Sequence, residues 1–156
     1  MLLNHYTAFL EKHLQGRPAT LVNDKGQTVA FERFEYQVEE ALLPMLLHQF
    51  ASIIIGSDNT PETGGSYCLK KEITSGISLG LSRSVQDNDD GSHSSIVIAN
   101  CTNTSTSPIT IGEIGMKKYI VFGQNYYVVF DRTPLGTPLT IQPGEVGRIV
   151  YTITMA

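Results

Sequence analysis

The sequence contains no tryptophan, only two cysteines and no long apolar run. No stretch comes near the ~20 consecutive apolar residues that cross a bilayer as a helix, so we expect no membrane partner. Residues 1–6 also lack the basic and continuous apolar segments of a secretory signal, so we expect synthesis in a cytosol. Two cysteines are too few for a disulfide framework. We therefore interpret Cys68 and Cys101 as small buried residues that remain thiols.

Charge is also sparse, and positive charge in particular. Charged residues make up 17% of the chain, where about 25% is typical of globular proteins. Eleven Lys and Arg residues stand against fifteen Asp and Glu residues, which gives a formal net charge of -4. Proteins that bind nucleic acid neutralise phosphates with clustered Lys and Arg. The composition therefore excludes nucleic acid as the expected partner.

The chain is long enough to fold around a single core. Its 156 residues are expected to bury roughly 68–70% of the surface of the unfolded chain. We predict one structural unit with two parts, an N-terminal helical and hairpin arm at 1–50 and a β-rich part at 51–156.

The predicted arm combines helical and strand patterns. Apolar residues recur at helical spacing over 2–14, and again over 31–50, where Pro44 predicts a kink. Between them, strands at 19–22 and 27–31 flank the polar stretch Asn23-Asp-Lys-Gly26, which suits a hairpin loop.

From Ala51 onward the pattern is that of strands. After a strand at 51–55 and a polar loop, we predict strands at 67–73, 77–85, 94–100, 109–117, 119–122 and 126–130. Turn residues separate them at the spacing of a sandwich. The predicted fold class is mainly β, an antiparallel β-sandwich of two sheets with an N-terminal helical and hairpin extension.

The last twenty residues read as two more strands folded across one turn. Pro143 and Gly144 suit the central positions of a type II turn, in which the second residue has a positive φ. After the turn, Ile149, Tyr151 and Ile153 alternate with Val150, Thr152 and Thr154. Because side chains alternate along a strand, the first set should share one face.

Three segments of this part resemble small bacteriophage virion structural proteins with a C-terminal β-sandwich. They are Ile53-Ile-Ile-Gly-Ser-Asp-Asn-Thr-Pro-Glu-Thr63 with its following Tyr-Cys-Leu, Ser107-Pro-Ile-Thr-Ile-Gly-Glu-Ile-Gly-Met116, and Val128-Val-Phe-Asp-Arg-Thr-Pro-Leu-Gly-Thr-Pro-Leu-Thr-Ile-Gln-Pro-Gly-Glu145. The closing Tyr-Thr-Ile-Thr continues the resemblance, which covers roughly residues 51 to 156. The order Asp131-Arg132 is the reverse of the order typical of those proteins.

The resemblance implies a non-enzymatic structural subunit of the head, neck or tail of a virion, made in the cytoplasm of a bacterial host. It implies contacts with copies of the same chain and with other virion proteins, and therefore a homo-oligomer. It carries no catalytic, cofactor-binding or metal-binding residues. A carbohydrate- or receptor-binding module of a phage particle remains the alternative function.

Two sequence patterns resemble a catalytic or a metal-binding motif but lack the surrounding residues that such a motif requires. Gly76-Ile-Ser-Leu-Gly80 matches the motif that presents a hydrolase serine, but Ser78 lies in a strand pattern with no helix after it. Residues 87–93 are acidic, yet they lack the Gly and Glu positions of an EF-hand loop. We predict a solvated hairpin tip there and leave an irregular calcium loop as an alternative.

Aromatic and histidine residues complete the candidates. Tyr119, Tyr126 and Tyr127 could form a sugar-binding surface, because a tyrosine ring is apolar while its hydroxyl forms hydrogen bonds; ordinary strand packing is the other interpretation. The four histidines, His5, His13, His48 and His93, show no metal-ligand spacing. We therefore predict no catalytic, cofactor or metal site.

Overall fold

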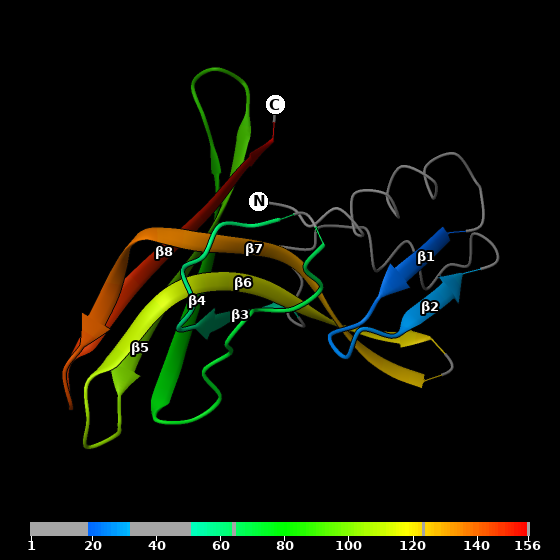
Figure 1. Cartoon of the computed structure of the whole chain (residues 1–156). Helices are drawn as coiled ribbons and strands as arrows, with labels where there is room; N and C mark the ends of the chain where they lie inside the picture. Colours follow the sequence, from blue (N-terminus) through cyan, green and yellow to red (C-terminus); the bar gives the residue numbers. More distant parts are fainter. Residues whose placement is uncertain (1–18, 32–50, 64, 123, 156) are drawn as a thin grey trace. The chain divides into compact units, whose positions relative to one another are not determined.

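The computed structural model describes residues 19–31, 51–63, 65–122 and 124–155. These residues form eight strands and contain no helix (Figure 1). The strands are β1 (Ala19–Val22), β2 (Thr28–Phe31), β3 (Ala51–Gly56), β4 (Ile77–Asp87), β5 (His93–Asn103), β6 (Ile109–Phe122), β7 (Gln124–Ile141) and β8 (Val146–Met155). The fold class is thus mainly β. The predicted helix at 2–14 lies outside the described residues. So does the one at 31–50, except for Phe31, which ends β2 and is therefore not helical.

The strands form one hairpin and two three-stranded sheets. β1 pairs with β2, one sheet has the order β3-β6-β7, and the other has the order β4-β5-β8. The recorded pairings of β1 with β2, β3 with β6, and β5 with both β4 and β8 are antiparallel. The predicted antiparallel β architecture is therefore confirmed at this level.

The N-terminal hairpin has the predicted strands and turn. Asn23 organises the turn, because its side-chain oxygen accepts hydrogen bonds from the backbone N–H groups of Lys25 and Gln27. Gly26 adopts a φ of 77°, a left-handed conformation that favours glycine. The polar stretch that predicted a loop thus closes the hairpin through the side chain of Asn23.

By contact density the described residues belong to two compact units. One contains those up to Glu72 together with Ile111–Pro138, and the other contains Ile73–Thr110 together with those from Leu139 onward. The predicted boundary at residue 50 remains a prediction, because residues 32–50 are not described.

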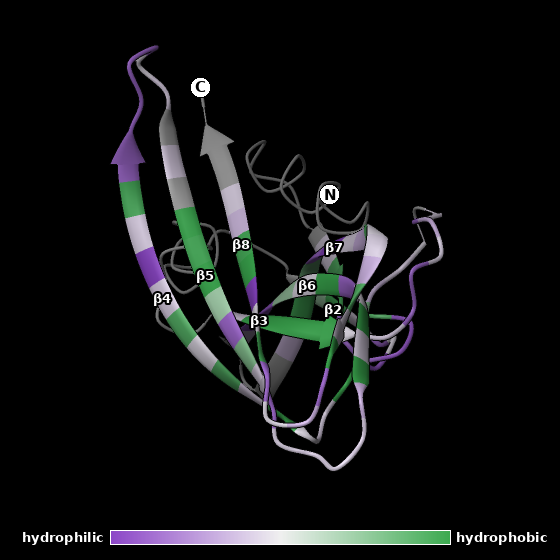
Figure 2. Ribbon diagram, turned by 90° about the vertical axis from the view of Figure 1, so that its left-hand side faces the viewer, coloured by the Kyte–Doolittle hydropathy of each residue, from purple (hydrophilic) through white to green (hydrophobic). Residues whose placement is uncertain are grey.

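The sheet β3-β6-β7 contains the core of the first unit. Both faces of β3 are buried, with Ile53, Ile54 and Ile55 at 2%, 9% and 2% exposure. Figure 2 shows this strand as continuously apolar. A strand covered on both faces is expected to be an unbroken apolar run rather than an alternating one.

The sheet β4-β5-β8 of the second unit has alternating faces. Ile149 lies opposite Ala99 in β5, and Val150 lies opposite Ile98. Directly opposite residues share a face, and the exposures of Ile149 and Val150 are 6% and 55%. The predicted separation of these two side chains onto opposite faces is confirmed. Figure 2 shows apolar and polar residues alternating along β4, a strand that is exposed along nearly its whole length.

Three predicted strand boundaries are wrong. Residues 67–73 are not a strand; they form a loop that makes a single bridge, between Gly56 and Glu72. The break expected at Lys118 is absent because β6 runs through it. The strands expected at 126–130 and before Pro143 are one long strand, β7. β7 contains Pro134 and Pro138, which an edge strand tolerates because its outer N–H groups have no partner strand.

The predicted pairing of the last two strands is also wrong. Gly144 has the expected positive φ of 79°, and the N–H of Glu145 donates to the carbonyl oxygen of Gln142 at 3.0 Å, which closes the turn. The strand after the turn, however, pairs with β5, whereas β7 pairs with β6. The turn therefore passes the chain from one sheet to the other.

Candidate functional site

A fully buried arginine lies at the centre of the first unit. Arg132 comes from β7, and its Nε donates a hydrogen bond to Oε2 of Glu113 in β6 at 2.6 Å. Both side chains have an exposed fraction of 0%. The remaining guanidinium nitrogens contact the loop after β3. Nη1 donates to Glu62 Oε2 and Nη2 donates to the carbonyl oxygen of Thr60, both at 3.1 Å.

Glu113 also connects the other end of the same loop to the sheet. Its two carboxylate oxygens accept hydrogen bonds from the backbone N–H groups of Lys70 and Lys71, at 3.2 and 2.8 Å. In a strand, those N–H groups would donate to the backbone of a neighbouring strand. The side chain of Glu113 replaces that neighbour, which explains why residues 67–73 do not form the predicted strand.

The loop from Ser57 to Glu72 also has its own internal contacts. Asp58 accepts hydrogen bonds from the hydroxyl and the backbone N–H of Thr60, and these hydrogen bonds lower the pKa of its carboxyl group. Nζ of Lys70 donates to the Thr60 hydroxyl at 2.6 Å. The loop is therefore fixed both internally and to the sheet.

The electrostatics of Arg132 fit a structural role. Burial alone lowers the pKa of the guanidinium, but hydrogen bonds to Glu113 and Glu62 outweigh burial and raise that pKa above its ordinary value. The Arg132 guanidinium, like arginine side chains in general, therefore remains charged. We use the name loop clamp for the group made of Arg132, Glu113, Glu62 and the loop backbone bound to them. It can fix a long loop against a sheet. The charges of its side chains are paired with one another.

Sequence reasoning did not identify the loop clamp. Arg132, Glu113 and Glu62 were noted only as parts of three motifs, without a role. A signal was present, because Glu113 and Arg132 interrupt apolar strands with charges of opposite sign. Buried charges are almost always paired, so two such interruptions predict a pair.

Gly56 provides a test of how tightly the clamp is packed. A methyl group at this position would lie 2.7 Å from the carbonyl oxygen of Lys71 and would also meet the carboxylate of Glu113. We expect Gly56→Ala to lower the free energy of unfolding by about 1–3 kcal/mol, the usual cost of overpacking. Urea denaturation measures this, with Gly136→Ala as the control, because a methyl group there meets nothing within 4 Å. Equal stabilities for the two variants would contradict the packing described here.

Ser78 lies in β4, as its sequence pattern predicts. It is exposed and stands opposite Thr102 in a ladder of eleven consecutive residue pairs with β5. The sharp strand-to-helix turn that a hydrolase serine requires is not present at this position.

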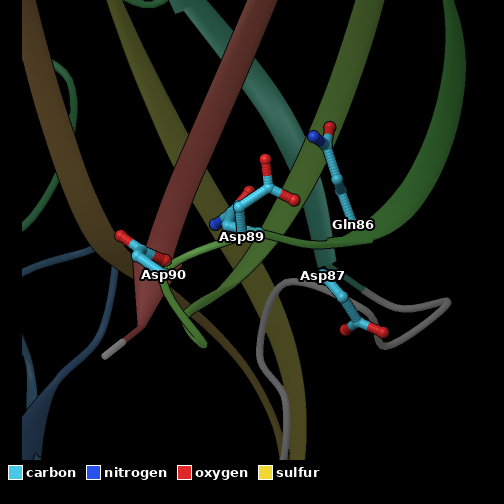
Figure 3. Close-up of a pocket in the computed structure, with 5 residues that line it drawn as sticks. Gln86, Asp87, Asp89 and Asp90 are labelled. Carbon is cyan, nitrogen blue, oxygen red and sulfur yellow. The ribbon is translucent and has the colours of Figure 1, made fainter.

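The acidic stretch forms the tip of the β4–β5 hairpin, as predicted. Gly91 has a φ of 82°, and Asp90 accepts hydrogen bonds from the backbone N–H and hydroxyl of Ser92, which lower the pKa of its carboxyl group. An open depression lies along Gln86 to Asp90. Figure 3 shows the side chains of Asp87, Asp89 and Asp90 pointing in different directions rather than toward a common point. Within the described residues, no three His, Cys, Asp or Glu side chains form a group that could hold a metal ion.

Two of the three candidate tyrosines lie together. The rings of Tyr119 and Tyr127 have centroids 5.2 Å apart, and Nζ of Lys117 lies 5.3 Å from the centroid of the Tyr127 ring. Tyr127 is 49% exposed. The side chain of Tyr126 is not among those described. This aromatic contact is the part of the predicted sugar-binding surface that the structure brings together.

The remaining candidates are thiols and histidines. Cys101 is buried as predicted, whereas Cys68 is only partly buried. Burial raises the pKa of both thiols, and for Cys68 the nearby Glu113 carboxylate adds to the effect. Both cysteines therefore favour the unreactive thiol form. His5, His13 and His48 lie outside the described residues, and the side chain of His93 is not described.

Comparisons with known proteins add no family to this description. No protein-family model, curated protein or solved structure matches the chain. Among the described residues, no helix is long and apolar enough to cross a membrane.

Proposed function

We propose that this chain is a non-enzymatic structural subunit of a bacteriophage virion, built on a β-sandwich with an N-terminal helical and hairpin arm. It assembles with copies of itself and with other head, neck or tail proteins after synthesis in the cytoplasm of a bacterial host. The proposal rests on the resemblance of residues 51–156 to such proteins.

The loop clamp is the observation that supports this proposal most directly. Each of the three resembling segments contributes one of its charged residues, namely Glu62, Glu113 and Arg132. These residues fasten a loop to a sheet and hydrogen-bond to one another. A motif that serves to fix a surface loop suits a protein whose surface must keep one shape in an assembly.

Exposed apolar side chains support an assembling subunit. Leu79, Leu81 and Val85 on β4, and Val146 and Val150 on β8, are between 37% and 59% exposed. β4 and β8 are the two edge strands of their sheet. Apolar surface on sheet edges is a feature of interaction sites, and soluble monomers usually protect such edges.

Sedimentation and virion analysis test the proposal. We expect purified protein at micromolar concentration to sediment as a species larger than its 17.1 kDa monomer, and to be detected by mass spectrometry in phage particles from the host that encodes it. Leu81→Asp should shift the protein toward the monomer. Thr106→Asp, which adds the same charge at an exposed residue between β5 and β6, away from β4 and β8, is the control. A protein that is strictly monomeric and absent from particles would refute the proposal.

A second candidate function is a carbohydrate- or receptor-binding module of a phage particle. The contact between Tyr119 and the exposed Tyr127 favours it, because partly exposed tyrosines held in place by neighbours are typical of recognition surfaces.

A further inference from the structure

Three segments of the first unit meet around Tyr127. The backbone N–H of Asp24, in the β1–β2 turn, donates to the carbonyl oxygen of Tyr127 at 2.9 Å. Nζ of Lys117 lies 3.1 Å from the Asp24 carboxylate and 3.5 Å from the Glu72 carboxylate. We call Tyr127, Lys117, Asp24, Glu72 and the nearby Tyr67 the tyrosine patch.

Tyr67 belongs to this patch through the same turn. A methyl group added at Gly26 would lie 3.0 Å from Cζ of Tyr67, so the tyrosine ring rests against the turn that carries Asp24. Tyr67 is 38% exposed and Tyr127 is 49% exposed. The patch therefore presents two partly open aromatic rings.

The patch is held in place before any ligand arrives. Lys117 is fixed by two carboxylates and by the Tyr127 ring, and its side chain is only 17% exposed. Tyr127 in turn is held by Tyr119 and by its backbone hydrogen bond to the turn. A preorganised surface loses little side-chain freedom on binding, which removes one of the costs of association.

We infer that the tyrosine patch binds a neutral pyranose unit of a glycan; this inference rests on the second proposed function. A pyranose ring has a face of C–H groups, which suits the exposed ring of Tyr127, and a rim of hydroxyl groups. An ionised carboxylate offers about four lone-pair positions, so Asp24 and Glu72 can accept from hydroxyls while paired with Lys117. Such a combination of apolar surface and a few placed polar groups is characteristic of small-molecule sites.

The charges of the patch select against acidic sugars. Among the three ionic groups that contact one another in the patch, two are carboxylates and one is an ammonium group. A carboxylated or sulfated sugar would meet repulsion there, whereas a neutral sugar would not. Neutral glycans are therefore the expected ligands.

The test begins with a glycan array that includes neutral and acidic glycans, probed with the full chain. We expect neutral glycans to bind, and the strongest of them then serves in calorimetric titrations. Tyr127→Ala is expected to weaken binding by about tenfold or more, the usual effect of truncating a central aromatic contact. Tyr127→Phe keeps the ring and should retain most of the affinity. Val146→Ala, which changes an exposed apolar residue of the other unit, is the control and should bind as the unchanged chain does.

A second measurement avoids dependence on the folding of Tyr127→Ala. In protein with isotopically labelled tyrosines, the bound glycan should shift the ring resonances of Tyr127 and Tyr67 but not that of Tyr151, which lies in β8. If the unchanged chain binds no glycan, both the inference and the carbohydrate-binding form of the second proposed function are wrong. If it binds a glycan, but Tyr127→Ala does not weaken binding and the Tyr127 resonances do not shift, only the assignment of the site to the tyrosine patch is wrong.

Discussion

Replacing Arg132 with alanine is expected to lower the free energy of unfolding by about 3–5 kcal/mol, the cost of removing one partner of a buried ion pair. The substitution leaves the carboxylate of Glu113 fully buried without its cation, and it releases Glu62 and the carbonyl oxygen of Thr60. Because a domain is stable by only about 5–15 kcal/mol, this loss brings the protein close to unfolding at room temperature.

Chemical denaturation with a double-mutant cycle measures this effect. Arg148→Ala is the control, because Arg148 is exposed and such changes are usually within about 0.5 kcal/mol. Adding Glu113→Gln to Arg132→Ala should cost less than the sum of the two single changes, since it removes the uncompensated charge and keeps an acceptor oxygen. Hydrogen exchange of residues 57–72 should also become faster. Additive effects and an unchanged loop would show that the clamp does not hold this loop.

Replacing Ile149 with aspartate is expected to unfold the sheet β4-β5-β8. Ile149 is 6% exposed and lies opposite Ala99 of β5, which is 0% exposed. The change forfeits about 1.5–3 kcal/mol of apolar burial and adds the cost of an unpaired charge in an apolar environment. We expect a total loss of several kcal/mol, seen as lost cooperative thermal melting.

The adjacent residue provides a matched control. Val150 is 55% exposed, so Val150→Asp introduces the same charge on the other face and should leave melting nearly unchanged. Truncation after Arg148 should reproduce the severe effect, because it removes most of the strand that pairs with β5. A truncated chain that melts cooperatively, or equal effects of the two aspartates, would refute this account of β8.

The loop clamp and the tyrosine patch could be predicted to different degrees. Tyr119 and Tyr127 were candidates from sequence, because a tyrosine ring is apolar while its hydroxyl forms hydrogen bonds. Asp24 and Glu72 could not be added to them, since they come from a distant turn and the end of a loop. For Arg132, the opposite charge of Glu113 within an apolar strand is a signal in the sequence that the two residues pair. The hydrogen bond from Arg132 to Thr60 joins residues 72 positions apart, and no pattern in the sequence indicates it.

The sequence alone determined most of the strands and the local turns between them. Alternation and turn chemistry are local properties, so the hairpin at Asn23, the turn at Gly144 and the opposite faces of Ile149 and Val150 followed from neighbouring residues. Only the tertiary structure decided which strands pair, and which segment with a strand-like sequence does not form a strand. β8 pairs with β5 rather than β7, and residues 67–73 form a loop because the Glu113 carboxylate accepts the N–H groups of Lys70 and Lys71. A backbone donor needs an acceptor of any kind, and which acceptor reaches it depends on the folding of residues far away in the chain.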